Sequence, residues 1–146
     1  MCGIVGYIGK KHTGIDIVLN GLAALEYRGY DSAGIALLDN TKTIHVHKQV
    51  GRVQALRDSM SHTQLATTTA IGHTRWATHG SPSTTNAHPH YNADKTIAVV
   101  HNGIIENHQG LRKFLEDNGH TFLSETDTET IPHLLDYYSH KTKTFQ

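Results

Sequence analysis

The sequence predicts a single α+β domain, because patterns typical of helices and of strands alternate along one chain of 146 residues. An apolar stripe at helical spacing lies within residues 13–27, and continuous apolar runs typical of strands lie at 33–38 and 96–100. The length suits one sizeable hydrophobic core and is short for two independent domains.

Composition narrows the class of partner. Thirteen Lys and Arg balance thirteen Asp and Glu, so no basic surplus favours nucleic acid and no acidic surplus favours a disordered tail. A small molecule or another protein domain is the expected partner. The single cysteine cannot form an internal disulfide, and residues 1–20 show neither a signal peptide nor a membrane span. A cytoplasmic, reducing setting is expected.

The single cysteine lies at the start of the chain. Removal of Met1 would make Cys2 the first residue, which would then carry a nucleophilic thiol and a free α-amine. The reference pKa of an α-amine is about 7.7–8.0, against about 10.4 for lysine, so such an amine can accept a thiol proton near neutrality. The alternative is that Cys2 is a small buried residue. The apolar pair at 4–5, between Gly3 and Gly6, predicts a buried strand that would hold this terminus.

The first half of the chain predicts a helix on a sheet. The stripe has Thr13 as its expected N-cap and consists of Val18, Leu19, Leu22 and Leu25. A polar break at 27–32 precedes a strand at 33–38, a turn, and a second strand at 42–50. In the second strand His45 and His47 share one face, which favours a solvated face over a metal site. A short helix with Val53, Leu56 and Met60 and a surface loop at 61–69 follow.

Candidate binding residues follow a short strand at 70–72, in a long loop that reaches about residue 92. Arg75 offers a two-pronged donor that matches a carboxylate, and Trp76 offers a flat apolar wall. Four histidines lie in this region, and none has the i, i+4 spacing of a helical metal site. Structural or substrate-contact roles are therefore favoured over metal binding for His73, His79, His88 and His90.

The strand at 96–100 runs into Asn102 and Gly103, where a side-chain amide and a backbone N–H can point into one pocket. Such a pair can bind an oxyanion, although Asn-Gly is also the commonest tight turn. A helix is expected at 107–118, stopped by Gly119, and a short strand at 121–123. Residues 126–129 match a capping box for a helix with Pro132 in its first turn, so Asp127 has a second interpretation as helix-start chemistry.

Six ordered motifs together resemble one family. They are CGIVG at 2–6, EYRGYDSAGIA at 26–36, HTRWATHG at 73–80, HPH at 88–90, HNGIIEN at 101–107 and SETDTE at 124–129. The chain is similar throughout to the glutaminase domain of the glutamine:fructose-6-phosphate aminotransferases, which are class II amidotransferases with an N-terminal cysteine nucleophile. Purine-pathway and asparagine-forming relatives are similar at Cys2 and at 102–103, whereas the Trp76 stretch and the 26–36 run favour the sugar enzymes.

The resemblance implies a role for each matching residue. Cys2 would attack the glutamine side-chain amide to form a thioester, and Asn102 and Gly103 would form the oxyanion hole. Arg75 would bind the α-carboxylate of glutamine and Asp127 its α-ammonium group. The remaining residues would line or close the pocket: Trp76, Thr78, His79 and Arg28.

The resemblance also implies an architecture, the four-layer α-β-β-α sandwich of the N-terminal nucleophile hydrolases, with two antiparallel sheets between helices. Residues 1–146 would be the N-terminal part of a type 2 glutamine amidotransferase domain, and the sugar-isomerase domains would be absent. No cofactor or metal is expected, and the full-length enzyme is expected to be a homodimer. Two alternatives stay open: another ammonia acceptor, such as a phosphoribosyl sugar, and a catalytically silent fragment.

Overall fold

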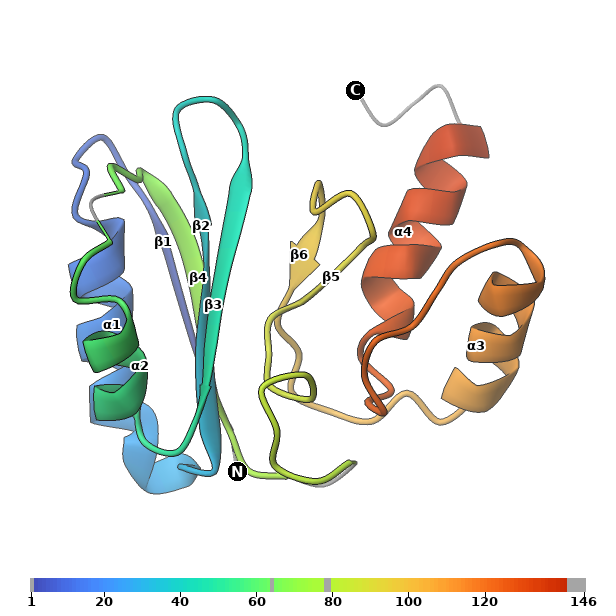
Figure 1. Ribbon diagram of the computed structural model, residues 1–146, viewed down its shortest axis with the longest axis horizontal. Coiled ribbons are helices and arrows are strands. Elements are labelled where there is room, and N and C mark those ends of the chain that lie inside the picture. Colours follow the sequence, from blue (N-terminus) through green and yellow to red (C-terminus); the bar gives the residue numbers. More distant parts are fainter. Residues whose placement is uncertain (1, 64, 78–79, 142–146) are drawn as a thin grey trace.

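The computed structural model describes residues 2–63, 65–77 and 80–141, and these form an α+β fold in four layers (Figure 1). Helices α1 and α2 cover one face of a four-stranded sheet. A two-stranded sheet lies on the other side of that sheet, and α4 and α3 lie outside it. The layer order is therefore α-β-β-α, as expected.

The larger sheet contains β1 (Gly3–Ile8), β2 (Ser32–Leu38), β3 (Ile44–Val50) and β4 (Thr69–Arg75) in the order β1-β4-β2-β3. All of its pairs are antiparallel. Gly3 lies opposite Thr74, and Ser32 lies opposite Arg75. The starts of β1 and β2 therefore meet the end of β4, which brings Cys2 beside residues 75–76.

The hydrophobic core lies between this sheet and helices α1 (Gly14–Leu25) and α2 (Val53–Ser59). The expected stripe of α1 is confirmed at Val18, Leu19 and Leu22, which are 0–2% exposed. Thr13 occupies the expected N-cap position and its carbonyl accepts the Ile17 N–H, but its side chain makes no capping hydrogen bond. The other helix, α2, is capped by a side-chain carboxylate. Glu26, in the 3-10 turn Glu26–Arg28, accepts the Val53 N–H at 2.7 Å.

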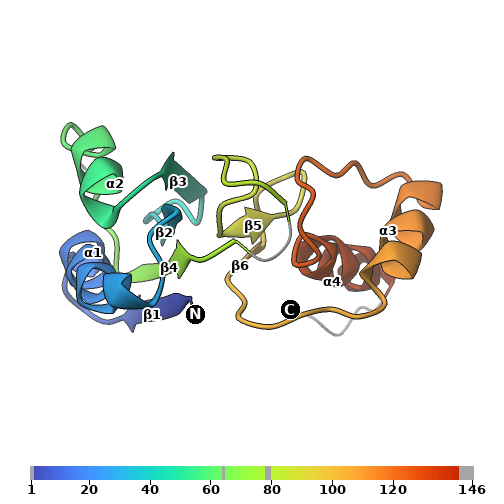
Figure 2. The ribbon, with the colours of Figure 1, turned by 90° about the horizontal axis from the view of Figure 1, so that it is seen from below.

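The second half of the fold contains β5 (His90–Tyr91), β6 (Ala98–Val99), α3 (His108–Asp117) and α4 (Thr130–Lys141) (Figure 2). The expected buried strand at 96–100 is wrong in extent and burial. Only Ala98–Val99 pair, and 97–100 are half-buried, because β6 has a strand neighbour on one side alone within the described ranges. The expected helix stop is confirmed, since Gly119 follows α3 with φ of 90°.

Several expectations about strand formation and burial are wrong for the same reason. Contacts with distant parts of the chain, and not the local sequence pattern, decide which residues pair and which are buried. Residues 121–123 form no strand, and Leu123 is 63% exposed. Ile4 is 41% exposed, so β1 is covered on its helix side only. In the expected surface loop, Thr67 is fully buried and its hydroxyl oxygen lies 2.7 Å from the carbonyl oxygens of both Leu38 and Thr69, to one of which it donates.

The expected capping box at 126–129 does not form. Glu129 accepts the N–H groups of Leu123 and Ser124, whereas the Thr126 N–H donates to the Ser124 hydroxyl. Helix α4 begins at Thr130, and Pro132 lies in its first turn as expected. None of the helices in the described ranges combines the length and the apolar character that a membrane crossing needs.

Candidate active site

A pocket of about 330 Å³ lies where the start of β1 and the end of β4 face the loops at 101–104 and 126–128. It collects residues from six separate stretches of the chain. The predicted site residues that line it are Cys2, Arg28, Arg75, Trp76, Asn102, Gly103 and Asp127. Two predicted residues, Thr78 and His79, lie outside the described residues.

The thiol of Cys2 is held by the backbone of Trp76. Its Sγ accepts the Trp76 N–H at 3.2 Å and lies 3.6 Å from the Trp76 carbonyl oxygen. The register of β1 on β4 creates this contact, since the next residue, Gly3, lies opposite Thr74 and donates its N–H to the Thr74 hydroxyl at 3.1 Å. The half-buried sulfur therefore faces the pocket from a fixed strand end.

The segment that follows α1 supports residues 75–77. The Asp31 N–H donates to the Arg75 carbonyl at 3.1 Å, and the Asp31 carboxylate accepts the Ala77 N–H. Gly29 packs so closely that a Cβ there would lie 3.0 Å from the backbone of Arg75 and Trp76. Through these contacts the segment at 26–36 holds Arg75 in position. Arg75 is 4% exposed and lines the pocket.

Asn102 connects Cys2 to a buried histidine. Its Nδ2 donates to the Cys2 carbonyl at 3.1 Å, and its Oδ1 lies 2.9 Å from His73 Nε2. The alternative of a simple hairpin turn at Asn102 and Gly103 is wrong, because the chain continues into α3 rather than into a paired strand. Gly103 has φ of 152°, a conformation that side chains disfavour.

Three buried histidines form a layer behind Asn102. His73 stacks on His88 with ring centroids 4.2 Å apart, and His88 contacts His90 edge-on at 4.6 Å. Burial lowers the pKa of His73 to about 4, although its hydrogen bond with Asn102 acts in the opposite direction. The layer is therefore neutral at pH 7. Within the described ranges, no group of three or more His, Cys, Asp or Glu side chains is placed to hold a metal ion.

Asp127 faces the pocket from the loop before α4. It is 5% exposed, and its Oδ2 accepts the Ile105 N–H at 2.7 Å. Its carbonyl also accepts the Thr130 N–H, so the helix-start interpretation describes the backbone of Asp127 while its side chain faces the pocket.

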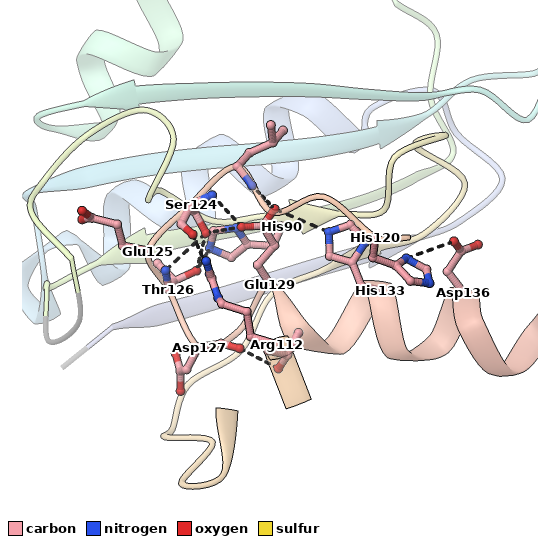
Figure 3. A network of polar contacts seen from close by, with 12 residues as sticks. His90, Arg112, His120, Ser124, Glu125, Thr126, Asp127, Glu129, His133 and Asp136 are labelled. Atoms are coloured by element: carbon pink, nitrogen blue, oxygen red, sulfur yellow. Dashed lines mark hydrogen bonds and ion pairs between the residues drawn. The ribbon is translucent and has the colours of Figure 1, made fainter. Parts of the chain in front are cut away.

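Figure 3 shows the network that holds this loop, with Glu129 accepting hydrogen bonds from the segment before it. The Leu123 N–H lies 2.8 Å from the carboxylate, and the Ser124 N–H and hydroxyl lie 2.6 and 2.5 Å from it. Burial by itself raises the pKa of Glu129, but the His133 ring 3.5 Å away and the hydrogen bonds from Leu123 and Ser124 outweigh it and lower the pKa to about 2. The ionised carboxylate therefore fixes the loop that carries Asp127.

Sequence reasoning missed six pocket residues. Two of them, His73 and His88, it considered only within a histidine group, and the others are His101, Ile104, Thr126 and Thr128. His101 Nδ1 lies 3.2 Å from the Thr128 hydroxyl, which joins the loop of Asn102 to the loop of Asp127. Adjacency to Asn102 and Asp127 was the available signal, but adjacency alone does not show which side chains point into a pocket.

A family model described as the glutamine amidotransferase domain matches residues 57–144. The chain belongs to this family. The match includes Arg75, Asn102, Gly103 and Asp127, and so covers most of the pocket described above.

Curated relatives of this glutamine amidotransferase domain are much longer proteins. The chain is 57% identical over 138 residues to the glutamine–fructose-6-phosphate aminotransferase (isomerizing) of Clostridium acetobutylicum, and 53% identical over 137 residues to that of Vibrio cholerae. Each match covers 94% of this chain and 22% of the relative. The chain thus spans about a fifth of the length of these relatives.

Solved structures share the fold of this domain. A glutamine phosphoribosylpyrophosphate amidotransferase from B. subtilis, complexed with ADP and GMP, matches with a TM-score of 0.78 and 27% identity. An allosteric regulatory enzyme of purine biosynthesis matches with a TM-score of 0.80 and 28% identity. Each match covers all of this chain and 30% of the other. The N-terminal nucleophile amidotransferase fold expected from the motifs is confirmed.

Proposed function

We propose that this domain releases ammonia from L-glutamine through a thioester on Cys2. The observation that carries the proposal is one pocket that brings together a thiol, an amide donor, an arginine and a carboxylate from distant parts of the chain. The Cys2 sulfur would attack the amide carbon of the substrate side chain, the C–N bond would break, and water would later release glutamate.

Removal of Met1 would supply the base for this reaction. The α-amine of Cys2 would take the thiol proton and pass it to the departing ammonia. Asn102 Nδ2, 3.1 Å from the Cys2 carbonyl, lies close enough to the nucleophile to stabilise the tetrahedral oxyanion together with the Gly103 N–H.

Substrate selection would depend on two opposite charges in the pocket. Arg75 would bind the α-carboxylate of glutamine through its planar fork, and Asp127 would bind the α-ammonium group. Such a pair recognises free glutamine rather than a glutamine side chain within a peptide. Trp76, which is 49% exposed and packs edge-on against Tyr30, would form an apolar wall, and Arg28 would close the pocket.

We further propose that the ammonia acceptor, in a full-length protein, is fructose 6-phosphate and that the product is glucosamine 6-phosphate. Identities of 53–57% to aminotransferases named for that sugar, against 27–28% to the amidotransferases of known structure, favour this acceptor over a phosphoribosyl sugar. The same proposal includes a cytoplasmic location, sugar-isomerase domains as partners, and a homodimer of the full-length chain.

Glutamine hydrolysis tests the proposal directly. The purified chain, with Met1 removed and its N-terminus verified by mass spectrometry, should convert glutamine to glutamate and ammonia, and Cys2→Ala should abolish the reaction. Gln54→Ala, at an exposed position outside the pocket, is the matched control and should retain full rate. If Cys2→Ala keeps the wild-type rate, or if the verified chain is inactive, the proposal for this chain is wrong.

A further inference from the structure

We propose that His73 is the positioning residue for Asn102, donating a hydrogen bond from Nε2 that fixes the orientation of the amide group beside the nucleophile. The inference rests on the proposed glutaminase function and deepens it. His73 lies in β4 and Asn102 lies in the loop after β6, so their hydrogen bond joins side chains from two separate segments of the chain.

The carbonyl oxygen of Cys2 determines which way the amide points. A carbonyl can only accept, and it lies 3.1 Å from Asn102 Nδ2, so the NH2 group faces Cys2. The flipped amide would bring two acceptor oxygens together at this distance. Oδ1 of Asn102 must therefore face His73, where it lies 2.9 Å from Nε2.

This orientation assigns the proton on His73. Oδ1 accepts only, so Nε2 must carry the hydrogen, and the neutral ring then leaves Nδ1 without one. Among the described residues Nδ1 is buried without a hydrogen-bond partner, which a bare acceptor tolerates better than an N–H donor. Burial keeps the ring neutral by lowering the pKa of His73 to about 4.

The ring of His73 is itself held in place. It is 1% exposed and stacks on His88 with an interplanar angle of 15°. His88 in turn lies against Gly34, the cross-strand neighbour of His73, where a Cβ would lie 2.0 Å from the His88 carbonyl oxygen. A packed sheet face therefore supports the donor, and the donor supports the amide.

The consequence is that one hydrogen of the Asn102 NH2 group is committed to Cys2 and the other is directed at a bound substrate. Without the His73 donor the amide could rotate by half a turn and present Oδ1 to the developing oxyanion. Repulsion there would slow turnover while leaving the groups that bind the ends of glutamine in place.

A double-mutant cycle on glutamine hydrolysis tests the inference. His73→Leu should lower kcat roughly 10–10²-fold with little change in KM, a part of the 10²–10³ that loss of a whole oxyanion donor costs. His73→Gln, which restores an N–H near the Nε2 position, should recover most of that loss. In an Asn102→Ala background, His73→Leu should cost less than about twofold, because its effect passes through Asn102.

His120→Leu is the matched control, since His120 is also largely buried but does not line the pocket, and its kcat should stay within about twofold of wild type. Equal losses from His73→Leu in both backgrounds, or no recovery with His73→Gln, would overturn the inference. Nitrogen-15 NMR of the His73 ring gives a readout without activity: a proton on Nε2 supports the inference, and a proton on Nδ1 overturns it. If the wild-type chain hydrolyses no glutamine, the proposed function is wrong. The NMR result does not depend on activity and would still decide the orientation of the Asn102 amide.

Discussion

Mild acid should destabilise this domain through its buried histidine layer. Burial lowers the pKa of His73 to about 4 and, together with Lys48, that of His90 to about 3, and it lowers the pKa of His88 further still. Because these folded-state values lie below the reference value of 6.5, the unfolded chain binds more protons than the folded chain as pH falls below 6.5. The stability that the three neutral histidines contribute is therefore fully present above pH 6.5 and is lost progressively below it.

The expected loss of unfolding free energy follows from how far the pH lies below the reference histidine pKa. At pH 5, which is 1.5 units below the reference value, each histidine that stays neutral in the fold costs about 2 kcal/mol, at 1.36 kcal/mol per unit. Three such histidines cost about 6 kcal/mol, which is comparable with the whole stability of an ordinary domain, about 5–15 kcal/mol. Glu129 adds little at this pH, since its pKa of about 2 keeps it ionised.

Urea unfolding at pH 7.5 and pH 5 measures this loss. His88→Phe keeps a flat ring in the stack and removes one titrating group, so the loss between the two pH values should shrink by about 2 kcal/mol. His62→Gln changes an exposed histidine and should leave the loss as in wild type. A wild-type free energy of unfolding that changes by less than about 2 kcal/mol over this range would refute the reasoning.

Four further outcomes are expected. Arg75→Lys should raise the KM for glutamine with a smaller effect on kcat, because a point charge replaces a fork at the carboxylate; steady-state hydrolysis measures both. Asn102→Ala should lower kcat roughly 10²–10³-fold, and a change in KM alone would make it a substrate contact or a turn residue. Glu129→Ala should lower the free energy of unfolding by on the order of 3 kcal/mol, measured in urea, because three donors, two of them buried, lose their acceptor. The chain alone should make no glucosamine 6-phosphate in a coupled assay, since the sequence after Gly103 shows no glycine-rich phosphate cradle, and detectable product would contradict the proposed division of labour.

Local patterns predicted the elements whose burial depends on near neighbours in the chain. The stripe of Val18, Leu19 and Leu22 needs only helical periodicity and a facing sheet, and it was predicted correctly. The stop after α3 needs only Gly119. The apolar run at 96–100 shows the limit of such patterns, because its burial depends on strand partners that periodicity does not specify.

In the candidate site, too, the sequence predicted what depends on single residues and not what depends on contacts between distant segments. Cys2, Asn102 and Arg75 could be chosen because their chemistry is visible in the sequence, but their meeting in one pocket depends on the register of β1 and β4. The function of Glu129 could not be predicted, because a capping box and a loop-holding carboxylate have the same sequence pattern. His73 was missed because its partner, Asn102, lies 29 residues further along the chain.

The central claim, that Cys2 is the nucleophile of a glutamine-binding pocket, is tested most directly by covalent labelling. The chain, with Met1 removed, is incubated with a glutamine analogue that carries an electrophile at the side-chain carbonyl, and the labelled peptide is mapped by mass spectrometry. The account predicts one label per chain on Cys2, with protection by excess glutamine and much slower labelling in Arg75→Lys. Label on another residue, or labelling of Cys2 that glutamine does not slow, would contradict it.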